Sequence, residues 1–589
     1  MPVDVGILIA AAPYIADLHS RHGDWLAGAG EPDAALAATL GELTALGRAS
    51  ADEAEMGRAM RVAKQRVALL AAVAEVTGLW TLAQSTAALS DLADAALHAG
   101  LDVLMRRAAE RGLLTAPGAA ETSGLALFAL GKHGGRELNY SSDIDIVAFF
   151  DPEQAPLADQ TEATKFFTRV MQRLAGMMQD RTDAGYVFRT DLRLRPDPGA
   201  TPVALPVEAA LTYYESRGQN WERAAWIKAR PCAGDRGVGE AFLRELAPYV
   251  WRKHLDFATI ADIQAMKRQI NIAKNVGDVR VEGHNVKLGL GGIREIEFFT
   301  QTQQLIAGGR DPSLRVRPTE QALAALAAAG WISAAAAGDL TETYWYLRAV
   351  ENRLQMLRDE QTHVMPETED GVATIARLMG AADRESFERD YRAALTRVVD
   401  YYGDLFVEGE TLGTAGGNLV FTGSDDDPGT IETLSAMGFK EPAKVSATVR
   451  KWHYGGYGAT RAAAARAHLT ELLPALLETL AATGNADEAM ARFDNFLSRL
   501  PAGVQLFSLL RQHERLRTLL VALLASAPRM ADAVIHRAHV MDSLIDPAFA
   551  DDVRRRANLV AKVGGFLDEA RSYEETIDRA RIIGQEQKF

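Results

Sequence analysis

Two aspartates separated by one residue give the first indication of chemistry in this sequence. Asp143 and Asp145 open an apolar segment that ends at Phe150, and they alternate with Ile144 and Ile146. If this segment is a β-strand, both carboxylates lie on one face while the isoleucines point into the core. Carboxylate oxygens are the ligands that Mg²⁺ prefers, so the pair predicts a site for a hard divalent cation.

A third aspartate, Asp191, lies in a later alternating segment, which we predict to be a strand over Gly185–Arg195. If that strand lies beside the first, three carboxylates cluster, and such a cluster repels itself unless cations neutralise it. We therefore predict a metal-dependent active site built on all three aspartates. Three arginines lie on the same face of this predicted strand as Asp191: Arg189, Arg193 and Arg195. They either contact phosphates or pair with the acidic cluster.

A glycine-rich turn precedes the aspartates. Leu125–Leu130 is a short apolar run that predicts a buried strand, and Gly131 and the pair Gly134-Gly135 follow it. We expect a short helical segment near Glu137, whose backbone N–H groups could cradle a phosphate. The order of strand, glycine turn, helix, Ser-Asp-x-Asp strand and later Asp strand resembles the polymerase-β type of nucleotidyltransferase fold. That resemblance implies nucleotide transfer with metal ions bridging carboxylates and phosphates.

Helices are expected to surround this α/β unit, because apolar residues recur at spacings of three and four through most of the chain. An amphipathic helix over Asp159–Gln179 should connect the second and third strands. We expect an α+β, predominantly helical protein with the nucleotidyltransferase domain embedded between helical bundles. The predicted domains are an N-terminal helical region over 1–115, a catalytic domain over 116–235, a helical domain over 236–411, a Gly- and Asp-rich linker over 412–429 and a helical domain over 430–589.

Composition narrows the class of protein. The 589 residues exceed what one core can hold, and 48% apolar with 24% charged residues is an ordinary globular balance. A net charge of -14 disfavours nucleic acid and anionic membranes as partners. With Cys232 as the only cysteine, an intramolecular disulfide is impossible. We read neither a signal peptide nor a run of about 20 apolar residues, so we expect a cytoplasmic protein.

The segment Gly131–Ile146 resembles the first signature of the glutamine synthetase adenylyltransferase/adenylyl-removing enzyme family. Further segments resemble later elements of that family, and together they cover most of residues 120–370: Arg189–Pro196, Tyr213–Glu215, Trp221–Ala224, Ile227–Pro231, Gly291–Phe298, Glu351–Met356 and Asp359–His363. Phe493–Phe496 and Leu500–Gly503 are similar to the region between the family's two catalytic halves.

The resemblance implies a function. The family's N-terminal half removes AMP from a tyrosine of glutamine synthetase by phosphorolysis, which releases ADP, and its C-terminal half attaches AMP from ATP. Only one Ser-Asp-x-Asp motif with a following Asp strand occurs here, so we expect the adenylyl-removing half plus the central helical region. The PII signal protein, glutamine and 2-oxoglutarate are the effectors that the resemblance implies, without residues we can assign to them.

The resemblance also implies roles for residues. Asp143, Asp145 and Asp191 are expected to be the catalytic residues and to bind Mg²⁺. The nucleotide- and phosphate-binding candidates are Gly131, Lys132, Gly134, Gly135, Ser142, Arg193, Arg195, Lys228 and Arg230. Lys287 is a further candidate for the nucleotide, whereas an ion-pair set that packs a helix on the catalytic domain is the favoured interpretation of Arg294, Glu295 and Glu297.

Two other functions stay open. A uridylyltransferase acting on PII shares the fold and a similar motif, but the clustered His-Asp dyads of its second module are not found here. A non-catalytic regulatory role suits residues 430–589, which carry no chemical motif.

Overall fold

The computed structural model describes residues 3–49, 52–251, 280–404, 419, 421, 426, 428–453, 455–500, 503–512 and 514–526. The described residues form two compact units. The first holds those up to 404, and the second holds those from 419 to 526. Within the described residues, no helix has the length and apolar character needed to cross a membrane.

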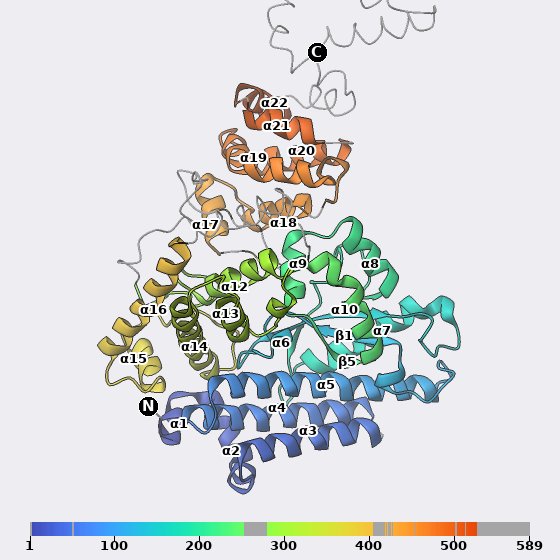
Figure 1. The fold of residues 1–589 in the computed structure, drawn as a ribbon, viewed down its shortest axis with the longest axis vertical. Helices are drawn as coiled ribbons and strands as arrows, with labels where there is room; N and C mark the ends of the chain where they lie inside the picture. Colours follow the sequence, from blue (N-terminus) through green and yellow to red (C-terminus); the bar gives the residue numbers. More distant parts are fainter. Residues whose placement is uncertain are drawn as a thin grey trace, which may run out of the picture. The chain divides into compact units, whose positions relative to one another are not determined.

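The first unit begins with a layer of helices, drawn in blue in Figure 1. Local capping fixes their starts: Asp52 accepts from the backbone of Glu55, and Thr81 and Gln84 form a capping box. The long helices α3, α4 and α5 pack on one another, and α5 also packs against the sheet. The helices of this layer are α1 (Val5–Ala11), α2 (Pro13–Gly28), α3 (Pro32–Ala49), α4 (Glu53–Val76) and α5 (Leu82–Glu110).

A small mixed sheet follows, in the order β3-β2-β1-β5 with β4 also paired to β2. Strand β1 runs antiparallel to β2 and β5, whereas β3 and β4 run parallel to β2. The strands are β1 (Leu125–Ala129), β2 (Asp143–Phe150), β3 (Arg189–Asp191), β4 (Ala204–Pro206) and β5 (Arg230–Gly234). The first two match the strands predicted from apolar runs, except that β1 ends at Ala129 and not at Leu130.

The third strand is shorter than predicted. We expected Gly185–Arg195, but only Arg189–Asp191 pairs in the sheet. A tight turn with backbone hydrogen bonds in both directions joins Thr182 to Gly185, and the chain turns away after Asp191. Alternation marks an extended backbone but does not show how far a neighbouring strand extends.

The two faces of the sheet bury different residues. On one face, Leu127, Ile146 and Phe150 join the core formed with α4, α5 and α7 (Ala163–Gln179). On the other, Phe128 and Phe149 pack among aromatic side chains of the helices that follow. Those helices are α8 (Val207–Ser216), α9 (Asn220–Ile227) and α10 (Arg236–Val250). The predicted helix over Asp159–Gln179 is confirmed as α7 with a 3-10 turn, Gln160–Glu162, before it.

Five helices complete the described part of the first unit: α12 (Ile293–Ala307), α13 (Thr319–Ala328), α14 (Ala334–Met356), α15 (Glu369–Leu378) and α16 (Arg384–Asp404). The second unit has its own apolar core and contains α17 (Pro428–Met437), α18 (Pro442–His453), α19 (Ala463–Ala481), α20 (Ala486–Arg499), α21 (Val504–Gln512) and α22 (Glu514–Ser526). Short 3-10 turns lie at Ala120–Thr122, Pro312–Leu314 and Gly458–Thr460. The described part of the chain is thus mostly helical, with a small sheet in the first unit. Most of the predicted linker lies outside the described residues.

Candidate active site

Three aspartates lie on neighbouring strands at the edge of the sheet. Asp145 of β2 lies opposite Asp191 of β3 in the parallel register, and Asp143 lies opposite Arg189. Neighbouring strands are about 4.8 Å apart, so the side chains of Asp145 and Asp191 share one surface. The sequence could only suppose that the strand of Asp191 lies beside the strand of Asp145, and the structure shows that it does.

Protein donors already balance part of this negative charge. The Arg193 guanidinium contacts both oxygens of Asp191, with Nε 3.0 Å from Oδ1 and Nη2 2.6 Å from Oδ2, and the Arg193 amide donates to Oδ1. The amide group of Gln361 donates to Asp143 at 2.8 Å. Asp191 is 7% exposed, whereas the side chain of Arg193 is half exposed, so this charge-assisted pair is open to water on the arginine side.

The glycine turn lies directly against the aspartates. Gly131 has a φ of +53°, and a Cβ there would lie 2.6 Å from the Asp145 carboxylate. Both the backbone conformation and the space therefore require glycine at this position. The helix predicted near Glu137 begins earlier: α6 covers Gly131–Gly134, and Glu137 lies beyond it. The glycines themselves form the helical turn, which the breaker character of glycine concealed in the sequence.

Gly134 and Gly135 serve close packing. A Cβ on Gly134 would lie 2.3 Å from the carbonyl oxygen of Lys228, and one on Gly135 would lie 2.7 Å from the Glu137 carboxylate. Without these side chains, the turn rests directly on the segment that carries Lys228. The glycine pair thereby allows the turn to pack closely on this segment.

Lys228 lies beneath the turn and is almost fully buried. Its Nζ donates to Glu137 at 2.7 Å and to Thr319 at 2.9 Å, and Glu297 of α12 is 3.6 Å away. Burial alone would lower the pKa of Lys228, but Glu137 and Glu297 raise it above its usual value. The charge of Lys228 thus holds α12 and the turn together, in keeping with the packing role favoured for Glu297.

Two further predicted cations are also engaged within the protein. Arg230 forms two contacts with Asp94 of α5, at 2.5 and 3.0 Å, and donates to the carbonyl of His133. Arg195 donates to the backbone carbonyls of Leu192, Pro198 and Thr201, and so fastens the loop after β3. The use of these side chains for phosphate stays a prediction.

His133 does not point into solvent. Its ring is buried and bonds Asp94 at 2.7 Å, and the donor atoms of Asp94, His133 and Cys232 all lie within 4.8 Å of one another. Arg230 already neutralises Asp94, and burial raises the pKa of the Cys232 thiol above its usual range. The cluster therefore reads as an ion-pair network with a protonated thiol beside it.

Glu351 connects the glycine turn to the helical part of the unit. Its side chain is fully buried and contacts Lys132 through both oxygens, at 3.1 and 3.0 Å, His363 at 2.6 Å and Arg348 at 3.4 Å. Burial lowers the pKa of Lys132 to about 8, and Glu351 partly opposes that shift. The pKa of Glu351 itself lies well below its usual range because these cations outweigh the effect of burial.

The segment 361–363 brings this network to the aspartates. Gln361 contacts Asp143 while His363 contacts Glu351, and the Val286 amide donates to the His363 carbonyl at 2.7 Å. Lys287 follows Val286, and its charge contributes to the lowered pKa values of Lys132 and His363. Sequence reasoning gave Gln361, His363 and Glu351 no role, because they entered only as parts of family-like segments. Gln361 and Asp143 are 218 positions apart, beyond the reach of any local spacing rule.

Comparisons with known proteins show which proteins this chain resembles. A family profile for glutamate-ammonia ligase adenylyltransferase matches residues 4–245, and one for GlnD PII-uridylyltransferase matches residues 264–406. A protein of Agrobacterium fabrum is 54% identical over 91% of this chain and 55% of its own length. One of Mesorhizobium japonicum is 51% identical over 91% and 55%, and one of Brucella suis is 50% identical over 95% and 57%.

All three relatives carry the name bifunctional glutamine synthetase adenylyltransferase/adenylyl-removing enzyme. The chain spans about half the length of the curated relatives it matches. The uridylyltransferase profile matches one region, whereas the similarity to these relatives runs through nearly the whole chain. The chain therefore belongs to the family of bifunctional glutamine synthetase adenylyltransferase/adenylyl-removing enzymes.

Proposed function

We propose that this chain removes AMP from the adenylylated tyrosine of glutamine synthetase by phosphorolysis, on a catalytic domain of the polymerase-β type. The observation that carries the proposal is the pairing of Asp145 with Asp191 beside Asp143, with the Gly131 turn against them. The relatives' names supply the protein substrate and the bond. The Ser-Asp-x-Asp motif at 142–145, followed by the Asp191 strand, supports the adenylyl-removing direction through its resemblance to that half of the family.

The residues present suit Mg²⁺. Three carboxylates on one surface give an all-oxygen donor set for a hard cation, and their mutual repulsion favours its binding. Asp143, Asp145 and Asp191 would hold the ion, which would neutralise charge on the reacting phosphate. Arg193, which pairs with Asp191, would also be within the same cluster as the reacting phosphate and could contribute a charge-assisted hydrogen bond to it.

In the reaction, an oxygen of inorganic phosphate attacks the phosphorus of the AMP–tyrosine ester. The bond from phosphorus to the tyrosine oxygen breaks, the tyrosine takes up a proton, and ADP is released. Phosphate is already an anion, so positioning and charge neutralisation matter more than a strong base. The protein's task is therefore to hold two anionic groups in line.

Protein groups near the aspartates could perform that task. Gly131 leaves space beside the Asp145 carboxylate, and Glu351 holds the side chain of Lys132, which belongs to the same turn. We assign the turn, with Gly134, Gly135 and Ser142, to the nucleotide phosphate, Lys287 to the nucleotide, and Arg193 to the attacking phosphate. Lys228, Arg230 and Arg195, which have protein partners, are better suited to supporting the turn and the loop after β3.

The test is release of ADP from adenylylated glutamine synthetase with Mg²⁺ and inorganic phosphate, with and without uridylylated PII and 2-oxoglutarate. Asp143→Ala and Asp145→Ala should abolish it. Asp151→Ala is a matched control, since Asp151 follows the same strand at its other end and only caps a turn there. AMP transfer from ATP to unmodified glutamine synthetase, without ADP release, would assign the opposite direction.

A second candidate rests on the match of residues 264–406 to the uridylyltransferase profile. It predicts uridylyl transfer from UTP to PII by the same three aspartates. Labelled UTP with PII, in parallel with the first assay, separates the two activities.

A further inference from the structure

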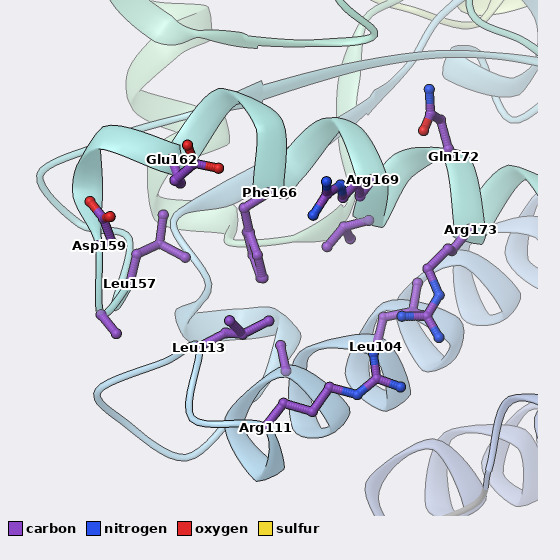
Figure 2. A pocket seen from close by; sticks show the side chains of 13 residues that line it. Leu104, Arg111, Leu113, Leu157, Asp159, Glu162, Phe166, Arg169, Gln172 and Arg173 are labelled. Carbon is purple, nitrogen blue, oxygen red and sulfur yellow. The ribbon is translucent and has the colours of Figure 1, made fainter.

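A cavity of about 590 Å³ lies between the C-terminal part of α5 and α7. Its floor is apolar, with Leu104, Ala108, Leu157 and Val170 almost fully buried. Leu113 stands at its edge with 47% of its surface exposed. In Figure 2, Phe166 points from α7 toward Leu113 across the cavity, while Asp159 and Glu162 lie at one end and Arg173 at the other.

The cavity is separate from the aspartates. The far end of α7 reaches the active site, where the Thr190 hydroxyl of β3 donates to Gln179 at 2.8 Å. Phe166 lies thirteen residues before Gln179, which is about 20 Å along a helix. A group bound beside Phe166 therefore belongs to a different site from the reacting phosphates.

The charged residues at the rim divide into engaged and unengaged groups. Glu162 pairs with Lys165 at 2.7 Å, Asp159 caps Thr161, and Arg173 pairs with Glu53. Arg111 and Arg169, by contrast, form no side-chain hydrogen bond or ion pair with any of the residues that the structure describes. Both Arg111 and Arg169 are exposed to solvent. The rim thus offers two uncommitted cations on a protein whose net charge is -14.

This arrangement matches a protein-binding surface better than a small-molecule site. Small-molecule sites place a few buried polar groups to orient the ligand, whereas the polar and charged residues that line this cavity are exposed. An apolar centre with arginines at the rim is the usual anatomy of a protein interface. Cations on an acidic protein also give a local attraction for acidic partners.

We propose that the cavity between α5 and α7 docks a segment of a partner protein that presents a large apolar side chain flanked by carboxylates. The apolar side chain enters between Phe166 and Leu113, and the carboxylates pair with Arg111 and Arg169. The site is independent of the phosphorolysis proposed above, and its occupation would not require either reactant.

The probe is a fluorescein-labelled peptide, Glu-Asp-Leu-Phe-Asp-Glu, titrated with the full chain and followed by anisotropy at low salt. We expect saturable binding that weakens about tenfold in the double variant Arg111→Glu/Arg169→Glu. Arg244→Glu is the matched control, since Arg244 is an exposed helical arginine on α10. It should leave the affinity unchanged.

Three comparisons localise the binding. Glu-Asp-Ser-Ser-Asp-Glu, which lacks the anchor, and Gln-Asn-Leu-Phe-Asn-Gln, which lacks the carboxylates, should each bind at least about tenfold more weakly. A photoreactive benzoylphenylalanine in place of phenylalanine should crosslink to the Leu113 or α7 segment.

Equal loss of affinity in the Arg244 variant, or binding that ignores both arginines, overturns the proposal. So does the absence of saturable binding by the acidic apolar peptide. Competition by 4-phenylbutyrate with an affinity equal to that of the peptide would show a small-molecule site instead, and would overturn the assignment to a partner segment.

Discussion

Two glutamates on α12 differ in their surroundings and should respond oppositely to the same substitution. Glu297 faces Lys228, and although burial opposes it, Lys228 and Lys132 lower the pKa of Glu297. Glu295 is 8% exposed, and burial raises its pKa from 4.5 to about 7, although a hydrogen bond with the backbone of Gly291 lowers the pKa in part. We therefore predict a stability that depends on pH through Glu295.

The sign follows from proton uptake. Between pH 4.5 and about 7 the folded protein keeps a proton on Glu295 that the unfolded chain releases, so stability falls as the pH rises through this window. A shift of about two and a half pKa units corresponds to about 3 kcal/mol. Glu295→Gln keeps the shape and removes the charge. It should be nearly neutral at pH 5 and should increase the free energy of unfolding by about 3 kcal/mol, relative to wild type, at pH 8.

Glu297→Gln is the matched control on the same helix. It weakens the pairing of buried Lys228, which keeps Glu137, so it should cost about 1–3 kcal/mol at both pH values. Urea unfolding of wild type and both variants at pH 5 and pH 8 measures these differences. If Glu295→Gln changes stability equally at the two pH values, Glu295 is not held protonated by its burial and the reasoning is refuted.

Three further predictions concern the active site. Asp145→Asn should lower the rate of ADP release by about 10³-fold without changing the thermal unfolding midpoint by more than a few degrees, and an unchanged rate would remove the aspartates from the chemistry. Gly131→Ala should impair activity because the added Cβ would meet the Asp145 carboxylate. Gly330 is also at positive φ but in open space, so Gly330→Ala should cost only about 1–2 kcal/mol of stability and leave activity unchanged. Equal activity of the two variants would contradict the steric argument. Glu351→Gln should destabilise the protein by about 3–5 kcal/mol and lower the pKa of Lys132 further below 8. Glu342 lies on the same helix but its side chain is 74% exposed, so Glu342→Gln should cost less than about 0.5 kcal/mol. Similar melting points of the two variants would show that the Glu351 network is not a buried charge cluster.

The local sequence was sufficient to predict the first two strands, although not the length of the strand that carries Asp191. Leu125–Ala129 and Asp143–Phe150 follow from apolar runs bounded by turn residues, and alternation placed Asp191 in phase with its neighbours. The family resemblance also followed from the sequence and is supported by relatives that are 50–54% identical. These features depend on residues close together in the chain, and the chain's periodicity records them directly.

Tertiary structure decided which charges are free to act. Lys228 and Arg230 looked like phosphate ligands in the sequence, but Glu137 and Asp94, from distant segments, hold both of them. Gln361 and Glu351 looked unremarkable, yet they join Asp143 and Lys132 to the helical part of the unit. The sequence determines which side-chain types are available to the site. The pairing of their charges depends on burial and on contacts between segments that lie 91 to 219 residues apart, which no local pattern encodes.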